Sequence, residues 1–308
     1  MFRRFSVPTW AVSLGLVSGL LLPIALLSVH RNSLRSSSQV RASTVDQPLP
    51  YPSPYPSPAS SIAPNTEVGV RRQLNYDEWV QLLKREAAAI AARSPSKLKV
   101  LAGDSLSLWF PSNLLPPGAT WLNQGISGET SYGLLKRVKL LDHTKPQTIF
   151  VMVGINDLIR GVRGETLVAN QREIVRHLKA AHPQAAIVIQ SILPHGGDRA
   201  SRRYLASVKG DPAAKERQHP LWVDRLPTIS SRWIRTINEK LERVAQDEGV
   251  EYLDLHSAFA DADGYIKEKL TTDGLHLSIA GYVLWRSKLQ QVGESAAKPP
   301  ISHSVTSP

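Results

Sequence analysis

Residues 98–107 read Leu-Lys-Val-Leu-Ala-Gly-Asp-Ser-Leu-Ser, a short apolar run that ends in a glycine and two polar residues. Such a run, bounded by a turn signal, is typical of a buried strand. Similar runs follow it, and segments with helical spacing of apolar residues separate them. The strands are expected at 98–102, 120–123, 148–153, 185–191 and 250–255, and the helices at 131–141, 166–181, 230–248 and 278–291. This alternation predicts an α/β fold whose five-stranded parallel sheet is covered on both faces.

A further helix is predicted before the first strand. Asn75 is a good N-cap for a helix over residues 76–93, in which Trp79, Leu82, Leu83 and Ile90 follow helical spacing, and Ser94-Pro95 closes it. We therefore divide the folded part into a leading helix, 75–96, and a main domain, 97–292.

The ends of the chain have a different character. Residues 7–29 carry no charge over 23 positions after a basic start, about the 20 residues that cross a bilayer as a helix. We expect 1–32 to be a membrane anchor, with a cleaved signal peptide as the alternative, and the catalytic body to lie outside the cytoplasmic membrane. Residues 33–74, which contain a Tyr-Pro-Ser-Pro repeat, are predicted to be a disordered linker, and 293–308 a disordered tail.

Composition excludes several classes of function. The 308 residues include no cysteine, so a disulfide framework, a Cys nucleophile and thiolate metal sites are all ruled out. The net charge of +11 is spread along the chain, and residues 96–293 hold 26 Lys and Arg against 20 Asp and Glu. No nucleic-acid-binding signature is present, so we expect no nucleic acid partner. We also expect the protein to be a monomer.

The loop after the first predicted strand holds the candidate nucleophile. In an open parallel sheet, ligands bind at the carboxyl ends of the strands. Gly103 allows a tight turn there, and Ser105 can present its hydroxyl at the start of a helix. Taken alone, Asp104-Ser105 is more often a helix N-cap than a nucleophile turn.

The next two post-strand loops supply candidate oxyanion donors. Gly125 follows the second strand, where a bare backbone N–H can approach a substrate, and Asn156 follows the third with a side-chain amide. With the Ser105 N–H they would give three donors to a tetrahedral oxyanion. A tight turn at Gly125 and helix capping at Asn156 are the alternatives.

A serine hydroxyl needs a base to accept its proton. His276 follows the fifth predicted strand, and Asp273 lies three residues before it, close enough to orient the imidazole. The other histidines show no metal-binding spacing, so we expect no metal and no cofactor.

Together the four blocks resemble those of the SGNH/GDSL hydrolase family over about residues 97–292. The blocks are Gly103-Asp104-Ser105-Leu106-Ser107, Gly125, Gly154-Ile155-Asn156-Asp157 and Asp273-Gly274-Leu275-His276. The resemblance implies a flavodoxin-like three-layer α/β/α sandwich. It also implies a catalytic triad of Ser105, Asp273 and His276, with Ser105, Gly125 and Asn156 as oxyanion donors. Residues 273–285 look most similar to the branch of platelet-activating-factor acetylhydrolase-like enzymes and bacterial sugar O-acetylesterases.

The long segment 195–229 departs from a compact family member. It is basic and contains aromatic residues, so it could cover the site as a lid, and a surface insertion is the alternative. The candidate substrate contacts are Leu106 in the nucleophile loop and, within this segment, His195, Tyr204 and Trp222.

The predicted activity is hydrolysis of short acyl esters, including O-acetyl groups on extracytoplasmic glycans, by way of an acyl-enzyme. A lysophospholipase or thioesterase acting on longer acyl chains and an SGNH-type O-acyltransferase are the alternatives, and a non-catalytic binding module comes last. The expected partners are an ester of a glycan or a lipid and, through the N-terminal segment, a membrane.

Overall fold

The computed structural model describes residues 74–209 and 219–295. The residues predicted to form an anchor and a linker, and most of the tail, lie outside this part of the chain. Within the described residues, no helix is long and apolar enough to cross a membrane.

The centre of the fold is a parallel five-stranded sheet with the order β2-β1-β3-β4-β5. Its strands are β1 (Leu98–Gly103), β2 (Thr120–Gly125), β3 (Pro146–Met152), β4 (Ala186–Gln190) and β5 (Glu251–Leu253). This order is that of flavodoxin-like folds, in which the chain reverses direction across the sheet between β1 and β3. The predicted α/β class and all five strands are confirmed.

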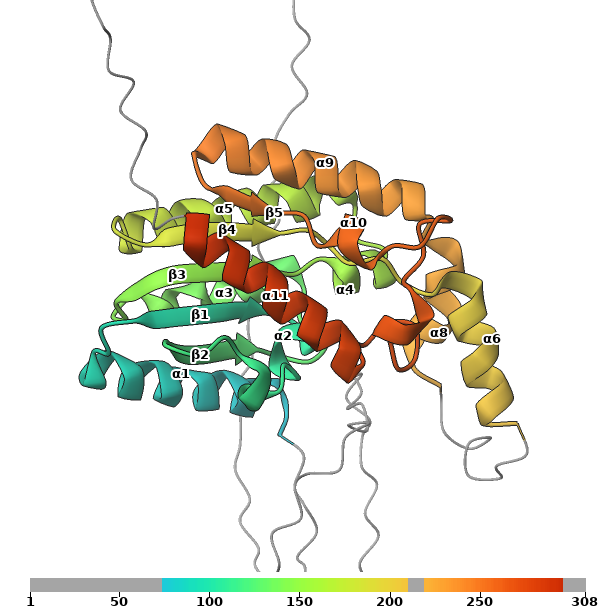
Figure 1. Ribbon diagram of the computed structural model, residues 1–308, viewed down its shortest axis with the longest axis horizontal. Coiled ribbons are helices and arrows are strands. Elements are labelled where there is room, and N and C mark those ends of the chain that lie inside the picture. The colour runs from blue at the N-terminus through green and yellow to red at the C-terminus, as the bar shows by residue number, and fades with distance from the viewer. Residues whose placement is uncertain (1–73, 210–218, 296–308) are drawn as a thin grey trace, which may run out of the picture. The chain divides into compact units, whose positions relative to one another are not determined.

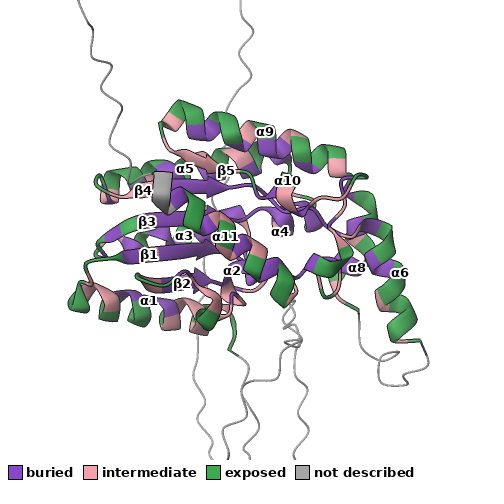
Figure 2. Ribbon diagram, in the orientation of Figure 1, coloured by how far each residue is buried: buried purple, intermediate pink, exposed green. Residues whose placement is uncertain are grey.

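Helices form a layer on each face of the sheet (Figure 1). One face packs against α1 (Tyr76–Arg93), α3 (Ser131–Arg137), α5 (Gly164–Ala181) and α9 (Ser231–Glu248). The other face packs mainly against α11 (Ile279–Ser295) and the short α10 (His256–Phe259). The central strands β1, β3 and β4 are mostly buried, the edge strand β5 is only partly buried, and the helices expose their outer faces, as Figure 2 shows.

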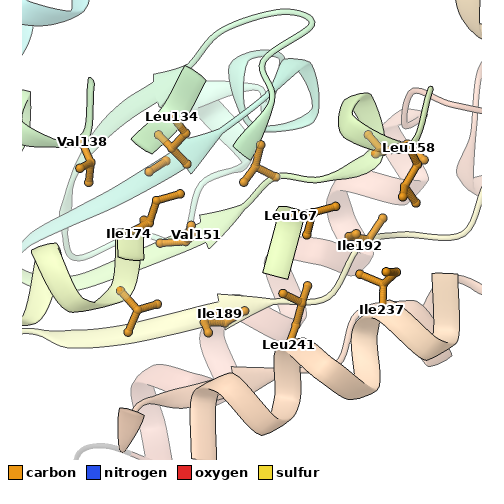
Figure 3. Packing of buried hydrophobic residues seen from close by; sticks show 14 of the residues in the cluster. Leu134, Val138, Val151, Leu158, Leu167, Ile174, Ile189, Ile192, Ile237 and Leu241 are labelled. Carbon is orange, nitrogen blue, oxygen red and sulfur yellow. The ribbon is translucent and has the colours of Figure 1, made fainter. Parts of the chain in front are cut away.

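Two separate apolar clusters follow from the alternation of side chains along the strands. Val151 and Ile189 point toward α3, α5 and α9, where they meet Leu134, Leu167 and Leu241 (Figure 3). Their neighbours Phe150 and Val188 point the other way, toward Tyr282 and Trp285 of α11. The sheet is thereby fixed between two cores, and its carboxyl edge becomes a rigid platform for the loops.

The leading helix begins and ends where the sequence predicts. The Asn75 side chain accepts a hydrogen bond from the Glu78 N–H at 2.9 Å, and Glu78 returns one to the Asn75 N–H, which completes a capping box. At the other end Ser94 adopts a left-handed conformation with φ of 45°. Leu83 and Ala87 are its buried residues, and they attach α1 to the core beside β2.

The remaining elements are short and lie around the carboxyl edge or between the strands. The α-helices are α2 (Ser105–Leu108), α4 (Ile155–Ile159), α6 (Gly197–Ser207) and α8 (Leu221–Arg225). The 3-10 helices are η1 (Ser112–Leu114), η2 (Val138–Leu141), η3 (Leu226–Thr228) and η4 (Glu268–Leu270). In Figure 1, α6 and α8 extend beyond the strand ends.

Candidate active site

The Gly103-Asp104-Ser105 turn connects β1 to α2. A Cβ on Gly103 would lie 2.2 Å from the Met152 carbonyl oxygen, so only glycine allows β1 to pass β3 this closely. Asp104 is the N-cap of α2, and its Oδ1 accepts the Leu106 N–H at 3.0 Å. Ser105 is the first residue of the helix and is 6% exposed. The helix N-cap is therefore Asp104, and the Ser105 side chain is not used as the cap of α2.

Burial dominates the electrostatics of Asp104. It raises the pKa of this carboxyl to about 7, against the effect of the hydrogen bond from Leu106, and the negative charges of Asp157 and Glu129 add to the increase. The group beside the candidate nucleophile thus titrates near neutral pH.

Asp273 and His276 form a close pair in the loop before α11. His276 Nδ1 lies 2.7 Å from Asp273 Oδ2, while Asp273 Oδ1 accepts the N–H groups of Leu275 and His276 at 2.8 and 2.7 Å. Gly274 has a φ of 90°, which lets the chain turn tightly between the two side chains. With Nδ1 directed at the carboxylate, Nε2 is the imidazole nitrogen that can accept a proton from a hydroxyl.

The pKa of Asp273 reflects two opposing effects. Burial acts to raise it, but the hydrogen bond and charge of His276 and the two backbone N–H donors outweigh burial and hold the pKa below its usual range. Asp273 is therefore ionised at neutral pH and can stabilise a protonated imidazole.

The loop that carries His276 packs against the helix that carries Ser105. Trp109, the C-cap of α2, has its ring centroid 4.3 Å from that of His276, and its N–H donates to the Ser105 carbonyl. Farther along α11, the Tyr282 hydroxyl donates to the Leu106 carbonyl at 3.1 Å. The structure thus brings together two segments that are more than 160 residues apart in the sequence.

Asn156 has the environment expected of an oxyanion donor. It is the second residue of α4, directly after β3, and its Nδ2 is buried without a hydrogen-bond partner among the described residues. This amide is therefore free to donate to an acceptor at the carboxyl edge of the sheet, as an oxyanion donor must be.

The prediction for Gly125 needs a correction. Its N–H donates to the Asn123 side chain at 3.0 Å, so this donor is already occupied. The glycine is needed for another reason: a Cβ there would lie 2.3 Å from the Leu108 N–H nitrogen. Gly125 thus allows α2 to approach β2, a reason different from the tight turn that the sequence offered as the alternative.

Gly128 carries a second candidate backbone donor in the same turn, which the prediction from sequence did not include. It lies in the turn after β2 with a φ of 74°, and within the described residues its N–H donates to no acceptor. The Ser105 N–H is likewise without an acceptor there. The signal in the sequence is the second glycine of Gly125-Ile126-Ser127-Gly128.

Asn123 is a second residue that sequence reasoning missed. Its Nδ2 donates to the Ser107 carbonyl at 2.6 Å, while its Oδ1 accepts the Gly125 N–H. One side chain therefore connects the end of the nucleophile helix to the end of β2.

A small internal cavity lies beneath these loops. Its free volume is about 10 Å³, roughly the room for one water-sized group. The lining consists of residues that flank the candidate site residues or end the adjoining strands: Asp104, Leu106, Met152, Val153, Ile155, Ile192, Leu193, Pro194 and Leu275. Leu106, a predicted substrate contact, is among them.

Trp222 and Tyr204 are not placed as a lid over the site. Trp222 is 2% exposed, belongs to the core cluster on the α5 side of the sheet, and meets the Tyr204 ring edge-on at 5.4 Å. Arg225, at the end of the same helix, donates to the Ile159 carbonyl of α4 at 3.0 Å. The described part of the segment 195–229 is thus packed onto the domain, which corrects the prediction of substrate contact for these two aromatic residues.

His195 is also interior. It is 2% exposed, its Nδ1 accepts the Gly197 N–H at 2.9 Å, and burial lowers its pKa to about 4. Leu193 and Pro194 line the cavity, whereas His195 does not. The described residues contain no group of three or more His, Asp or Glu side chains that could hold a metal ion.

Residues 102–284 match the GDSL-like lipase/acylhydrolase family. The chain belongs to this family. Its members' common chemistry makes it a serine hydrolase that acts on ester bonds, and the fold predicted by resemblance is confirmed.

Individual relatives agree with this assignment. The chain is 28% identical to platelet-activating factor acetylhydrolase IB subunit alpha1 of Bos taurus over 66% of its length and 77% of that protein. It is 30% identical to the alpha2 subunit of Rattus norvegicus over 52% of its length and 58% of that protein. Among solved structures, a GDSL-like lipase from Bacteroides thetaiotaomicron superposes with a TM-score of 0.55 at 19% identity, covering 71% of this chain and 99% of that one.

Proposed function

We propose that this protein removes short acyl groups, acetyl foremost, from carboxylic esters through a triad of Ser105, His276 and Asp273. The observation that carries the proposal is the Asp273–His276 pair, with its 2.7 Å contact, packed through Trp109 against the helix that begins at Ser105. An oriented base beside a serine at a helix N-terminus is the arrangement that activates a hydroxyl.

The proposed reaction has two steps. His276 takes the proton of Ser105 as its oxygen attacks the ester carbonyl, and then gives a proton to the departing alcohol, which leaves an acyl-enzyme. A water molecule deprotonated by His276 releases the acid and restores the serine. The Asn156 amide and the Ser105 and Gly128 N–H groups are the proposed donors to the oxyanion in both steps. No cofactor takes part.

Two observations favour a short acyl group. The cavity lined by Asp104, Leu106 and Leu275, the sequence neighbours of Ser105 and His276, has a free volume of about 10 Å³, room for about one water-sized group, so it cannot enclose a long acyl chain. The mammalian relatives are named as acetylhydrolases. Longer-chain esters, as in a lysophospholipase or thioesterase, and acyl transfer to a sugar hydroxyl are the competing activities of the same triad.

The test is a series of p-nitrophenyl esters from acetate to palmitate with the full chain, next to Ser105→Ala. We expect the acetate and propionate esters to give the highest kcat/KM and the variant to lose this activity. A maximum at long chains would contradict the short-acyl proposal, and wild-type rates in Ser105→Ala would contradict the nucleophile. An added sugar acceptor that raises total ester consumption and yields acylated sugar would identify a transferase.

The proposed location is outside the cytoplasmic membrane, with an O-acetylated glycan as the natural ester. It rests on the uncharged stretch 7–29 and the Pro-rich segment after it. Protease added to intact cells should degrade the domain if the proposal is correct. Protection of the domain until the cells are lysed would overturn it.

A further inference from the structure

A buried polar network lies behind the candidate oxyanion donors and involves a helix outside the matched family region. Its centre is the ion pair of Glu129 and Arg137, whose side chains are 3% and 4% exposed and whose Oε2 and Nε atoms lie 2.6 Å apart. A buried charge pair needs further hydrogen bonds to be stable. The further hydrogen bonds of Glu129 and Arg137 show which backbone segments this ion pair connects.

Arg137 connects the turn after β2 to the nucleophile turn. Besides its bond to Glu129, its Nη2 donates to the Gly103 carbonyl at 3.1 Å. The Ile126 N–H donates to the same carbonyl at 3.1 Å. Gly103 is two residues before Ser105, so Arg137 fixes the position of the backbone that carries Ser105.

The same turn is also connected to the helix that carries Asn156. Asp157 accepts the Ser131 N–H at 2.8 Å and the Ser131 hydroxyl at 2.5 Å. Asn170 of α5 donates to that hydroxyl as well, at 2.9 Å. The segment 126–131 therefore holds Gly128 and is bonded to the immediate neighbourhoods of Ser105 and Asn156.

Helix α1 reaches this network through its first residue. The Tyr76 hydroxyl donates to Glu129 Oε2 at 3.3 Å and lies 3.5 Å from Oε1. Gly133 leaves the space for this contact, since a Cβ there would lie 1.9 Å from Glu129 Oε1 and 3.2 Å from the Tyr76 oxygen. Burial, with the charge of Glu129, raises the pKa of Tyr76 to about 12, so the hydroxyl remains a donor at neutral pH.

We propose that Tyr76, Glu129 and Arg137 are positioning residues that hold the Ser105, Gly128 and Asn156 donors at the correct spacing, and that α1 is thereby part of the active site. The family match begins at residue 102, after α1 ends at Arg93. This inference rests on the proposed function, because it assigns the network a role in oxyanion stabilisation.

The principal variant is Tyr76→Phe in the full chain, which removes one hydroxyl and keeps the ring. We expect kcat on p-nitrophenyl acetate to fall about tenfold with KM within about twofold, because a small displacement of donors lowers transition-state binding more than substrate binding. The matched control is Tyr132→Phe, since Tyr132 is 60% exposed on the neighbouring helix α3.

A second readout separates positioning from a loss of stability. A phenylboronic acid forms a tetrahedral adduct with a reactive serine and places an oxygen among the oxyanion donors. Its affinity should fall in Tyr76→Phe by the same factor as kcat/KM, measured well below the melting temperature of both proteins. Arg137→Lys keeps the charge but loses the forked contact, so we expect about a 100-fold loss of kcat, with Arg176→Lys on the surface as its control.

The outcomes are distinguishable. If the wild type hydrolyses no ester, the proposed function fails. If the wild type is active and Tyr76→Phe matches Tyr132→Phe in kcat and boronate affinity, or differs in melting temperature or KM alone, the positioning role is overturned.

Discussion

Asp273 and His276 are three residues apart, and the turn at Gly274 directs both side chains to each other. The resulting contact is local, so it forms wherever this loop folds. Its ability to stabilise a protonated imidazole depends on Asp273 remaining ionised. The bonds that lower the pKa of Asp273 have this effect.

Asp273→Asn should lower kcat about 10³- to 10⁴-fold at pH 7, because an amide neither holds the required imidazole tautomer nor stabilises its cation. The measurement is kcat on p-nitrophenyl acetate, with circular dichroism to verify folding. Asp263→Asn, an exposed carboxyl in the preceding loop, is the control. A loss below about tenfold would exclude Asp273 as the partner of the base.

Asn156→Ala should lower kcat about 10²- to 10³-fold with little change in KM, as expected for a donor used in the transition state. Asn113→Ala, at an exposed position of η1, serves as the control. Equal losses in both variants, or an increase in KM alone, would contradict the assignment.

Asp104 should make stability depend on pH. Because the pKa of this carboxyl is raised from 3.8 to about 7 by folding, the native state binds its proton more tightly than the unfolded state. The contribution of Asp104 to stability is then present below pH 4 and is lost as the pH rises toward 7. The corresponding free energy is at most about 4 kcal/mol.

Denaturant titrations of wild type and Asp104→Asn at several pH values measure this effect. The variant can keep the bond to Leu106 but cannot ionise. We expect the unfolding free energy of the wild type to fall relative to that of Asp104→Asn between pH 4 and pH 7. Parallel pH profiles would show that Asp104 titrates normally.

At the scale of elements, the segment 195–229 combines α6, which forms surface ion pairs with a neighbouring loop, and α8, which buries one large aromatic side chain. On α6, the charged residues Arg199 and Arg203 bond to Asp261 and Glu268, which precede Asp273 in the chain. On α8, Trp222 is enclosed in the core. An aromatic residue in a basic, irregular segment has two interpretations in sequence, and burial decides between them.

Trp222→Ala should cost about 3–5 kcal/mol of unfolding free energy, as for other large core residues, with KM unchanged in the folded fraction. Leu221→Ala, its 48% exposed neighbour, should cost under about 1 kcal/mol. Denaturant melts and substrate titrations measure the two quantities. A large rise in KM at unchanged stability would restore the substrate-contact prediction.

At the scale of the whole molecule, every residue proposed for catalysis or for positioning lies between Tyr76 and His276. A chain of residues 74–308 should therefore keep the kcat and KM of the full chain. A chain beginning at residue 97 lacks Tyr76 and uncovers the apolar surface beneath Leu83 and Ala87. We expect it to lose both stability and kcat, as thermal melts and ester hydrolysis would show. Equal kinetics for the two truncated chains would make α1 dispensable.

The sequence by itself determined the strands, the long helices, the nucleophile turn and the Asp273–His276 pair. Each of these depends on local information: a run of apolar residues with its turn signal, a cap, or two polar residues separated by one tight turn. The parallel arrangement followed from the alternation with helices, and the flavodoxin-like architecture from the family resemblance, while the strand order β2-β1-β3-β4-β5 came from the structure.

Only the tertiary structure decided which backbone donors are available and which side chains position them. The Gly125 N–H is bound by Asn123, and Gly103 and Ser131 are bonded to partners 26 to 34 residues away in the sequence. The burial of Trp222 likewise depends on tertiary packing, because it lies in the large core cluster and contacts Tyr204 of α6. These hydrogen bonds and this burial depend on distances between segments that are far apart in the sequence. The fold sets those distances, and a local sequence pattern does not contain them.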